Sequence, residues 1–95
     1  MKRIMQDTKE CYVCKSTIPL EYHHVFFGGR NRKKSDEDGL IVTLCPEHHR
    51  GTKGVHGKNG HELDIKLKQE AERTWMEYYN KTEEDFIKRY GKNYL

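Results

Sequence analysis

Apolar residues form two short runs in the first half of the chain and a helical stripe in the last third. Residues 22–27 (YHHVFF) place aromatic and β-branched side chains around two histidines, which is typical of a β-strand that Gly28-Gly29 ends. Residues 39–44 (GLIVTL) form the strongest strand pattern in the chain. Residues 30–38, between the runs, are almost entirely charged and polar and are predicted to form a loop.

The chain is predicted to enter a short helix at Cys45-Pro46, because proline favours the first helical position. Gly51 and Gly54 are expected to end this helix. Further along, apolar side chains recur at helical spacings and predict one face of a long helix. They are Leu63, Leu67, Ala71, Trp75 and Tyr78.

A second C-terminal helix is predicted to begin after Thr82. The sequence T-E-E-D offers an N-cap residue followed by acidic side chains, which favour a helix N-terminus. Phe86, Ile87 and Tyr90 are expected to form its apolar face, and Gly91 fits a C-cap.

The composition limits how large a core this chain can build. Its 95 residues are 34% hydrophobic and 35% charged, so we expect a single small domain with a thin core. A bound metal would add stability that packing cannot supply. We therefore predict one α+β domain over residues 1–95, with a metal-stapled core at 11–58 and two helices within 62–90. Residues 1–10 are polar and are expected to fray.

The sequence predicts neither a membrane span nor a signal peptide, because no apolar run approaches about 18 residues. Three cysteines cannot all pair within one chain, which favours metal ligation over disulfides. These features predict a soluble, cytoplasmic protein. The net charge of +3 is by itself a weak indication of a nucleic-acid partner.

The cysteines point to a metal site. Cys11 and Cys14 stand as C-Y-V-C, and Cys45 and His48 stand as C-P-E-H. Two such pairs, separated by an excursion of the chain, are the usual arrangement of a structural Zn²⁺ site with three thiolates and one imidazole. The alternative interpretation is that these are buried free thiols.

Further histidines lie close to this site in sequence. His23 and His24 are neighbours on a predicted strand, so their side chains point to opposite faces, and one can bind a metal while the other takes a proton from water. The alternative is that they are packed in the core. His49 follows His48 and points about 100° away on a helix. His56, between glycines, is a candidate third ligand or an exposed loop residue.

The combined pattern of H-H-V on a strand, a loop, and L-C-P-E-H-H-R resembles the HNH endonuclease family. These are ββα-metal nucleases with a treble-clef-like core, and many carry a structural zinc. The similarity covers about residues 11–56 and is greatest to compact phage and prophage members, including the recombination-associated Ref type. It implies a ββα-metal fold and metal-dependent hydrolysis of DNA phosphodiester bonds.

The resemblance also implies roles for the histidines. His23 resembles the first ligand of the catalytic metal, His24 the general base that activates water, and His49 the helix-borne ligand. His56 matches the last ligand only if the helix ends early. Lys53 occupies the nearer position and does not ligate while protonated.

One residue departs from the family pattern. The place of the family's middle asparagine falls on Gly39 or Leu40, which have no amide side chain. In the family this asparagine holds the loop that bears the general base, and Asn31 and Asp38 are candidates to replace it. The catalytic ion is left open among Mg²⁺, Mn²⁺, Ni²⁺ and Zn²⁺, since imidazole suits the later metals and magnesium prefers oxygen.

Basic residues are concentrated between the two predicted strands and after His49. A cluster there could hold DNA phosphates beside the catalytic ion, although charge runs are usually solvated. The candidate DNA-binding residues are Arg30, Arg32, Lys33, Lys34, Arg50 and Lys53. Such contacts carry no sequence information, so low specificity is expected.

The alternative function is a catalytically inactive, zinc-stabilised module that binds DNA or serves phage assembly or recombination. A homodimer and a recombination or packaging protein are further candidate partners.

Overall fold

The two apolar runs pair as an antiparallel two-stranded sheet in the computed structural model, which describes residues 2–95. Strand β1 is Glu21–His24 and strand β2 is Ile41–Leu44, with His23 opposite Val42 and His24 opposite Ile41. Both strands are shorter than predicted. Beyond β1 the chain turns away, although the Val25 N–H still donates to the Leu40 carbonyl at 3.0 Å.

The predicted loop at residues 30–38 is wrong, because this segment is helix α1 (Arg30–Asp38). Gly39 ends the helix in the left-handed conformation, with φ 79°, and its N–H donates to Ser35 O. Ser35 is fully buried, and its hydroxyl donates to Phe26 O at 2.7 Å and accepts from Phe26 N at 3.1 Å. Polar contacts of this kind hold α1 against the sheet in place of an apolar face.

The remaining helices are α2 (Pro46–His49), α3 (His61–Tyr79) and α4 (Glu83–Tyr90). The predicted proline start of α2 is confirmed, and the helix ends at His49, before the glycines. The predicted caps of α4 are also confirmed. Thr82 and Asp85 form a reciprocal capping box, and Gly91 closes the helix with φ 85°.

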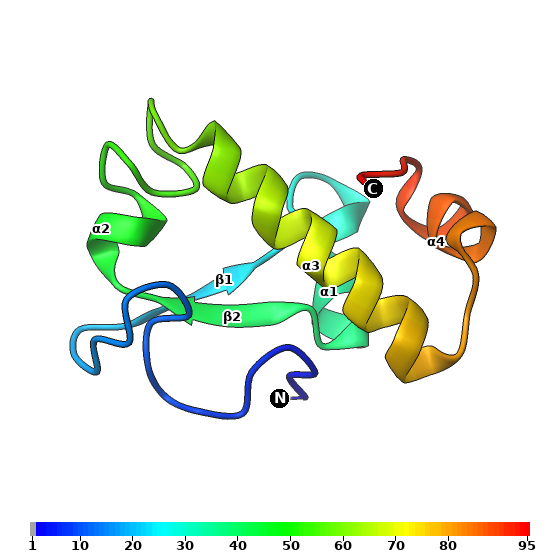
Figure 1. Ribbon diagram of the computed structural model, residues 1–95, viewed down its shortest axis with the longest axis horizontal. Coiled ribbons are helices and arrows are strands. Elements are labelled where there is room, and N and C mark those ends of the chain that lie inside the picture. The colour runs from blue at the N-terminus through cyan, green and yellow to red at the C-terminus, as the bar shows by residue number, and fades with distance from the viewer. Residues whose placement is uncertain (1) are drawn as a thin grey trace.

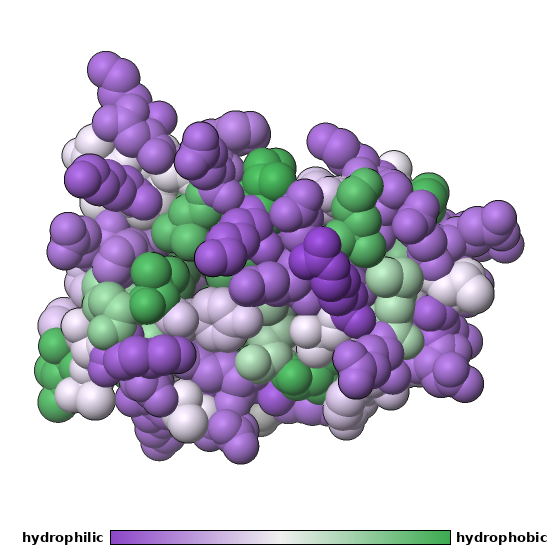
Figure 2. All heavy atoms as spheres, viewed as in Figure 1, coloured by the Kyte–Doolittle hydropathy of each residue, from purple (hydrophilic) through white to green (hydrophobic). Residues whose placement is uncertain are grey.

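Helix α3 crosses the sheet in the view of Figure 1, and its buried residues Leu67, Ala71 and Trp75 belong to the same core cluster as Val42 and Leu44. The predicted apolar faces of the C-terminal helices are only partly right. Tyr78 is 58% exposed and Ile87 37% exposed, whereas Phe86 and Tyr90 are buried. The face in Figure 2 is mainly hydrophilic, with small separate apolar patches.

The prediction that residues 1–10 fray is wrong for the part that the structure describes, and residue 1 lies outside it. The Ile4 N–H donates to Gly39 O at 2.9 Å, and the Gln6 side-chain oxygen accepts from the Thr43 N–H at 2.9 Å. This segment therefore packs along the end of α1 and the edge of β2.

Residues 2–95 form a small α+β fold with a two-stranded sheet and four helices, in agreement with the predicted class. None of the helices within residues 2–95 combines the length and apolar character required to cross a membrane.

Candidate metal centre and adjacent cleft

Three thiols and one imidazole meet where the N-terminal turn approaches the end of β2. Cys11 and Cys14 lie on a turn closed by the Lys15 N–H, which donates to Cys11 O at 2.9 Å. Cys45 is the N-cap residue of α2, and His48 lies on that helix. One ligand atom from each of the four residues lies within 4.8 Å of the others.

The distances fit a tetrahedral zinc ion. Ligand atoms around such an ion lie roughly 3.5–3.8 Å apart when the bonds are about 2.3 Å to sulfur and about 2.0 Å to nitrogen. The Sγ atoms of Cys14 and Cys45 are 3.8 Å apart. The Nδ1 atom of His48 lies 3.2 Å from Cys45 Sγ and 3.7 Å from Cys11 Sγ. This cluster could therefore bind a metal such as zinc.

Hydrogen bonding prepares one of these thiols for ligation. The Ser16 hydroxyl lies 3.0 Å from Cys14 Sγ, and hydrogen bonds from Ser16 lower the pKa of Cys14 to about 6. Burial instead raises the pKa of Cys45. Cys14 thus offers a thiolate at neutral pH, whereas Cys45 needs a bound cation to stabilise its charged form.

The side chains of His23, His49 and His56 form a second cluster, in which one ring nitrogen of each lies within 4.8 Å of the others. The ring centroids are 5.2 Å apart for His23–His49, 5.1 Å for His23–His56 and 4.9 Å for His49–His56. The sequence patterns had grouped these three residues, and the structure brings them together.

His23 provides the best test of whether this cluster fits a metal. Its side chain is 2% exposed, and its Nε2 atom has no hydrogen-bond partner among the described residues. Burial lowers the pKa of His23 to about 3, so the ring is neutral at physiological pH. A buried ring nitrogen without a partner costs free energy unless something fills its place. A metal ion between the three rings would do so.

The loop after α2 explains how His56 reaches this cluster. The His56 N–H donates to His49 O at 2.9 Å, and the Val55 N–H donates to His48 O at 2.9 Å. A Cβ atom on Gly57 would lie 1.8 Å from Gly51 O, so only glycine fits there. The early end of α2 and this tight loop together place His56 beside His49.

Glu21 supports the cluster and was not among the predicted site residues. Its Oε1 atom lies 2.7 Å from His49 Nδ1, which leaves His49 Nε2 to face the other rings. Hydrogen bonds from Arg50, and then from His49, lower the pKa of Glu21 to about 2. A signal was present in the sequence, because residues two apart on a strand share one face, as Glu21 and His23 do.

His24 belongs to neither of these clusters, and its side chain contacts helix α1. Its Nε2 atom lies 3.2 Å from Asp36 Oδ1. Both side chains line a cleft of about 480 Å³ together with Gly29, Arg32 and Lys33. Asp36 was missed because its segment was expected to be a loop. The cleft combines a histidine, a carboxylate and two cations.

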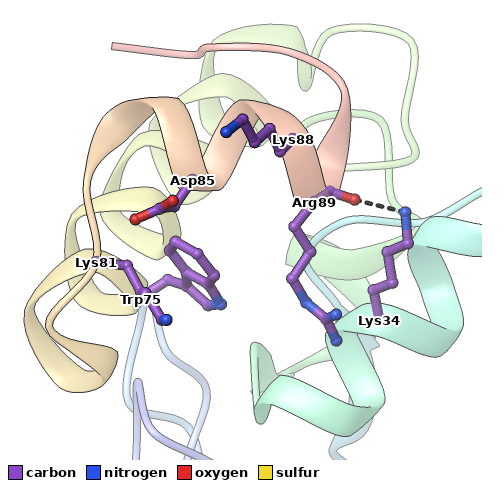
Figure 3. Close-up of a pocket in the computed structure, with 6 residues that line it drawn as sticks. All are labelled: Lys34, Trp75, Lys81, Asp85, Lys88 and Arg89. Carbon is purple, nitrogen blue, oxygen red and sulfur yellow. Dashed lines mark hydrogen bonds between the residues drawn. The ribbon is translucent and has the colours of Figure 1, made fainter.

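The other candidate DNA-binding residues are scattered. Lys34 points toward α4, where it donates to the carbonyl of Arg89, and both residues line a separate pocket of about 450 Å³ (Figure 3). Arg50 pairs with Glu21 at 2.7 Å. Arg30 and Lys53 are exposed. Only Arg32 and Lys33 lie beside His24.

Neither candidate for the missing family asparagine contacts His24 within the described part of the chain. The Asn31 amide donates to Tyr90 O at 3.4 Å. The Asp38 carboxylate accepts from Trp75 at 2.9 Å, from Tyr90 at 2.7 Å and from Arg89 at 2.5 Å. Both residues therefore join α1 to the C-terminal helices.

Comparison with protein-family models, with curated proteins and with solved structures finds no match to this chain.

Proposed function

We propose that this protein is a metal-dependent endonuclease of the HNH type that nicks or cleaves DNA with low sequence specificity. The observation that carries the proposal is the cluster of His23, His49 and His56, in which the buried Nε2 atom of His23 has no hydrogen-bond partner among residues 2–95. Three imidazoles on one side of an ion leave its remaining positions free for substrate and water, as catalytic sites require.

In this proposal the cysteine cluster is structural. Cys11, Cys14, Cys45 and His48 would surround a zinc ion completely, which leaves no position for a substrate. Its effect is to fix α2 against the end of the sheet. His49, the residue after His48, is thereby held opposite His23.

The protein side chains would divide the reaction between them. His24 would accept a proton from water while the water oxygen forms a bond to phosphorus and the bond to the leaving 3′ oxygen breaks. The leaving oxygen then takes a proton from solvent. Arg32 and Lys33, in the same cleft, would hold the phosphate backbone. The ion bound by the three histidines would supply charge stabilisation for the phosphate and the leaving oxygen.

The experiment is a nicking assay on supercoiled plasmid with Mg²⁺, Mn²⁺, Ni²⁺ or Zn²⁺. We expect the wild type to produce open-circular DNA with at least one of these ions. The nicking rate should fall by about 100-fold or more in His24→Ala and in His23→Ala, because a general base or a bound catalytic ion usually accelerates a reaction by at least this factor. His61→Ala is the matched control, since His61 is exposed at the start of α3 and belongs to neither cluster.

A second candidate function is a zinc-stabilised DNA-binding or phage accessory module without catalytic activity. It is favoured by Gly39 and Leu40, which stand where the family has an asparagine. Plasmid binding without nicking under every one of the four ions would favour this candidate and contradict the nuclease.

A further inference from the structure

We infer that Asp36 is the positioning residue for His24, holding its ring in the tautomer that can accept a proton from water at Nδ1. This inference rests on the proposed function and adds a residue that the family motif does not supply. Asp36 lies on α1, twelve positions after His24, and is brought to it by the fold.

The chemistry of the pair fixes where the proton is. An ionised carboxylate accepts hydrogen bonds and cannot donate them, so the 3.2 Å contact requires a hydrogen on His24 Nε2. In a neutral imidazole the other nitrogen, Nδ1, then carries the lone pair. Asp36 therefore makes Nδ1 the basic atom of His24.

The free nitrogen is accessible. His24 Nδ1 makes no hydrogen bond within residues 2–95, and it is not among their buried side-chain atoms without a partner. Its ring lines the cleft that also holds Arg32 and Lys33. A water molecule held beside a backbone phosphate in this cleft would thus meet an unprotonated nitrogen.

The contacts of α1 hold Asp36 beside His24. The preceding residue, Ser35, exchanges two hydrogen bonds with the backbone of Phe26, which follows His24 by two positions. The helix is thereby fixed to the chain that carries the base. Within the described chain Asp36 forms an ion pair with His24 only, although Arg32 and Lys33 share its cleft.

This arrangement also accounts for the missing asparagine. A positioned histidine needs a partner that fixes its orientation and tautomer. Gly39 and Leu40 cannot provide a side chain for this task. A carboxylate from the helix between the strands performs it here, and when His24 takes up the proton this carboxylate stabilises the resulting imidazolium.

The first test compares kcat and KM of Asp36→Ala, Asp36→Glu and Glu37→Ala in the plasmid assay. Glu37 is the matched control, because it is the next residue on α1 and its side chain is 52% exposed, against 58% for Asp36. Either alanine variant removes one negative charge near the DNA. We expect Asp36→Ala alone to lower kcat by about 10–100-fold with KM changed less than about three-fold.

Asp36→Glu should recover most of the lost kcat, since the exposed position has room for a longer carboxylate side chain. An equal loss in Asp36→Ala and Glu37→Ala, or an unchanged kcat in Asp36→Ala, would overturn the positioning role.

The second test does not need activity. Long-range ¹H–¹⁵N NMR correlations of the zinc-loaded protein report which nitrogen of His24 carries the hydrogen. We expect the Nε2–H tautomer in the wild type and Glu37→Ala, and a mixture in Asp36→Ala. A wild type with hydrogen on Nδ1, or an unchanged tautomer in Asp36→Ala, refutes the inference. If the wild type does not nick plasmid with any of the ions, the proposed function is refuted. The tautomer of His24 measured by NMR then decides alone whether Asp36 positions this ring.

Discussion

At the scale of single residues, the spacing of cysteines and histidines predicted which side chains lie together, while their roles stay predictions. Ligand spacing is a local property of turns and helices and can be read directly from the chain. Asp36 could not be found in this way, because its contact with His24 depends on how α1 packs. The contacts of Asp38 were equally hidden, since its partners lie on α3 and α4.

Asp38 is the residue with the largest expected effect on stability outside the metal clusters. Its side chain is 12% exposed, and its carboxylate accepts hydrogen bonds from Trp75, Arg89 and Tyr90. Asp38→Ala leaves all three donors without their acceptor, so we expect a loss of about 2–4 kcal/mol in the free energy of unfolding. Urea unfolding of the zinc-loaded protein measures it. Glu37→Ala, which breaks only an exposed pair, should cost less than about 1 kcal/mol.

At the scale of elements, the helices with an apolar stripe or clear caps were predicted, and α1 was not. The segment R-N-R-K-K-S-D-E-D has no apolar face, so its pattern is typical of a solvated loop. Tertiary contacts stabilise this segment as a helix. Ser35 and Asp38 are its buried residues, and both form hydrogen bonds to other elements. The spacing of apolar residues along the chain does not predict contacts of this kind.

Ser35→Ala tests this explanation of α1. The variant removes the only hydroxyl that pairs with the N–H and the carbonyl of Phe26 in the described structure. Two backbone groups would then be buried without partners, and we expect a loss of about 1–3 kcal/mol in unfolding free energy. Lys33→Ala, on the exposed face of the same helix, should change it by less than about 0.5 kcal/mol. Equal effects in the two variants would contradict a polar anchor.

The docking of α4 on α1 should be sensitive to alkaline pH. Burial, and then the hydrogen bond to Asp38, raise the pKa of Tyr90 above its ordinary value. The folded protein therefore keeps Tyr90 neutral at a pH where the unfolded chain loses its proton. This contribution to stability is complete below about pH 10, the ordinary tyrosine pKa, and is lost as the pH rises above it.

We accordingly expect the unfolding free energy of the wild type to fall as the pH rises above about 10. The fall should be smaller in Tyr90→Phe, which cannot ionise at this position. Urea unfolding at a series of pH values measures the difference. Parallel curves for the two proteins would rule out Tyr90 as the source.

At the scale of the whole molecule, the described residues contain a cysteine cluster and an aromatic cluster of Phe26, Phe86 and Tyr90, which lie in different parts of the fold. Cys45 and His48 of the cysteine cluster belong to the start and body of α2, and Phe86 and Tyr90 belong to α4. Figure 1 shows α2 and α4 at opposite sides of the molecule. With zinc in the cysteine cluster, a core this thin would be stabilised by the metal as well as by the aromatic packing. The overall α+β class was predictable from pattern and composition, but the placement of the two clusters was not, since it results from how α3 crosses the sheet and how α4 packs against α1 and α3.

Metal removal should separate the two clusters. We expect mild EDTA treatment to strip an ion from the three-histidine cluster and to end nicking, with the melting temperature nearly unchanged. Removal of zinc from the cysteine cluster by a thiol-reactive mercurial, or by Cys45→Ser, should lower the melting temperature by more than about 10 °C. Metal analysis and calorimetry follow both steps. A melting temperature insensitive to loss of all zinc would show that the cysteines are not a structural site.

The short helix α2 has one further consequence. His48 and His49 are consecutive residues in it, yet each belongs to a different cluster. A tilt of this helix would move both imidazoles at once, so the two clusters cannot be assembled independently. Metal binding to the cysteine cluster should raise the metal affinity of the three-histidine cluster. By thermodynamic reciprocity, an ion in the three-histidine cluster should raise the affinity of the cysteine cluster by the same factor. The pair of neighbouring histidines would then impose an order on metal loading, in which the three-histidine cluster binds its ion tightly only after the cysteine cluster holds zinc.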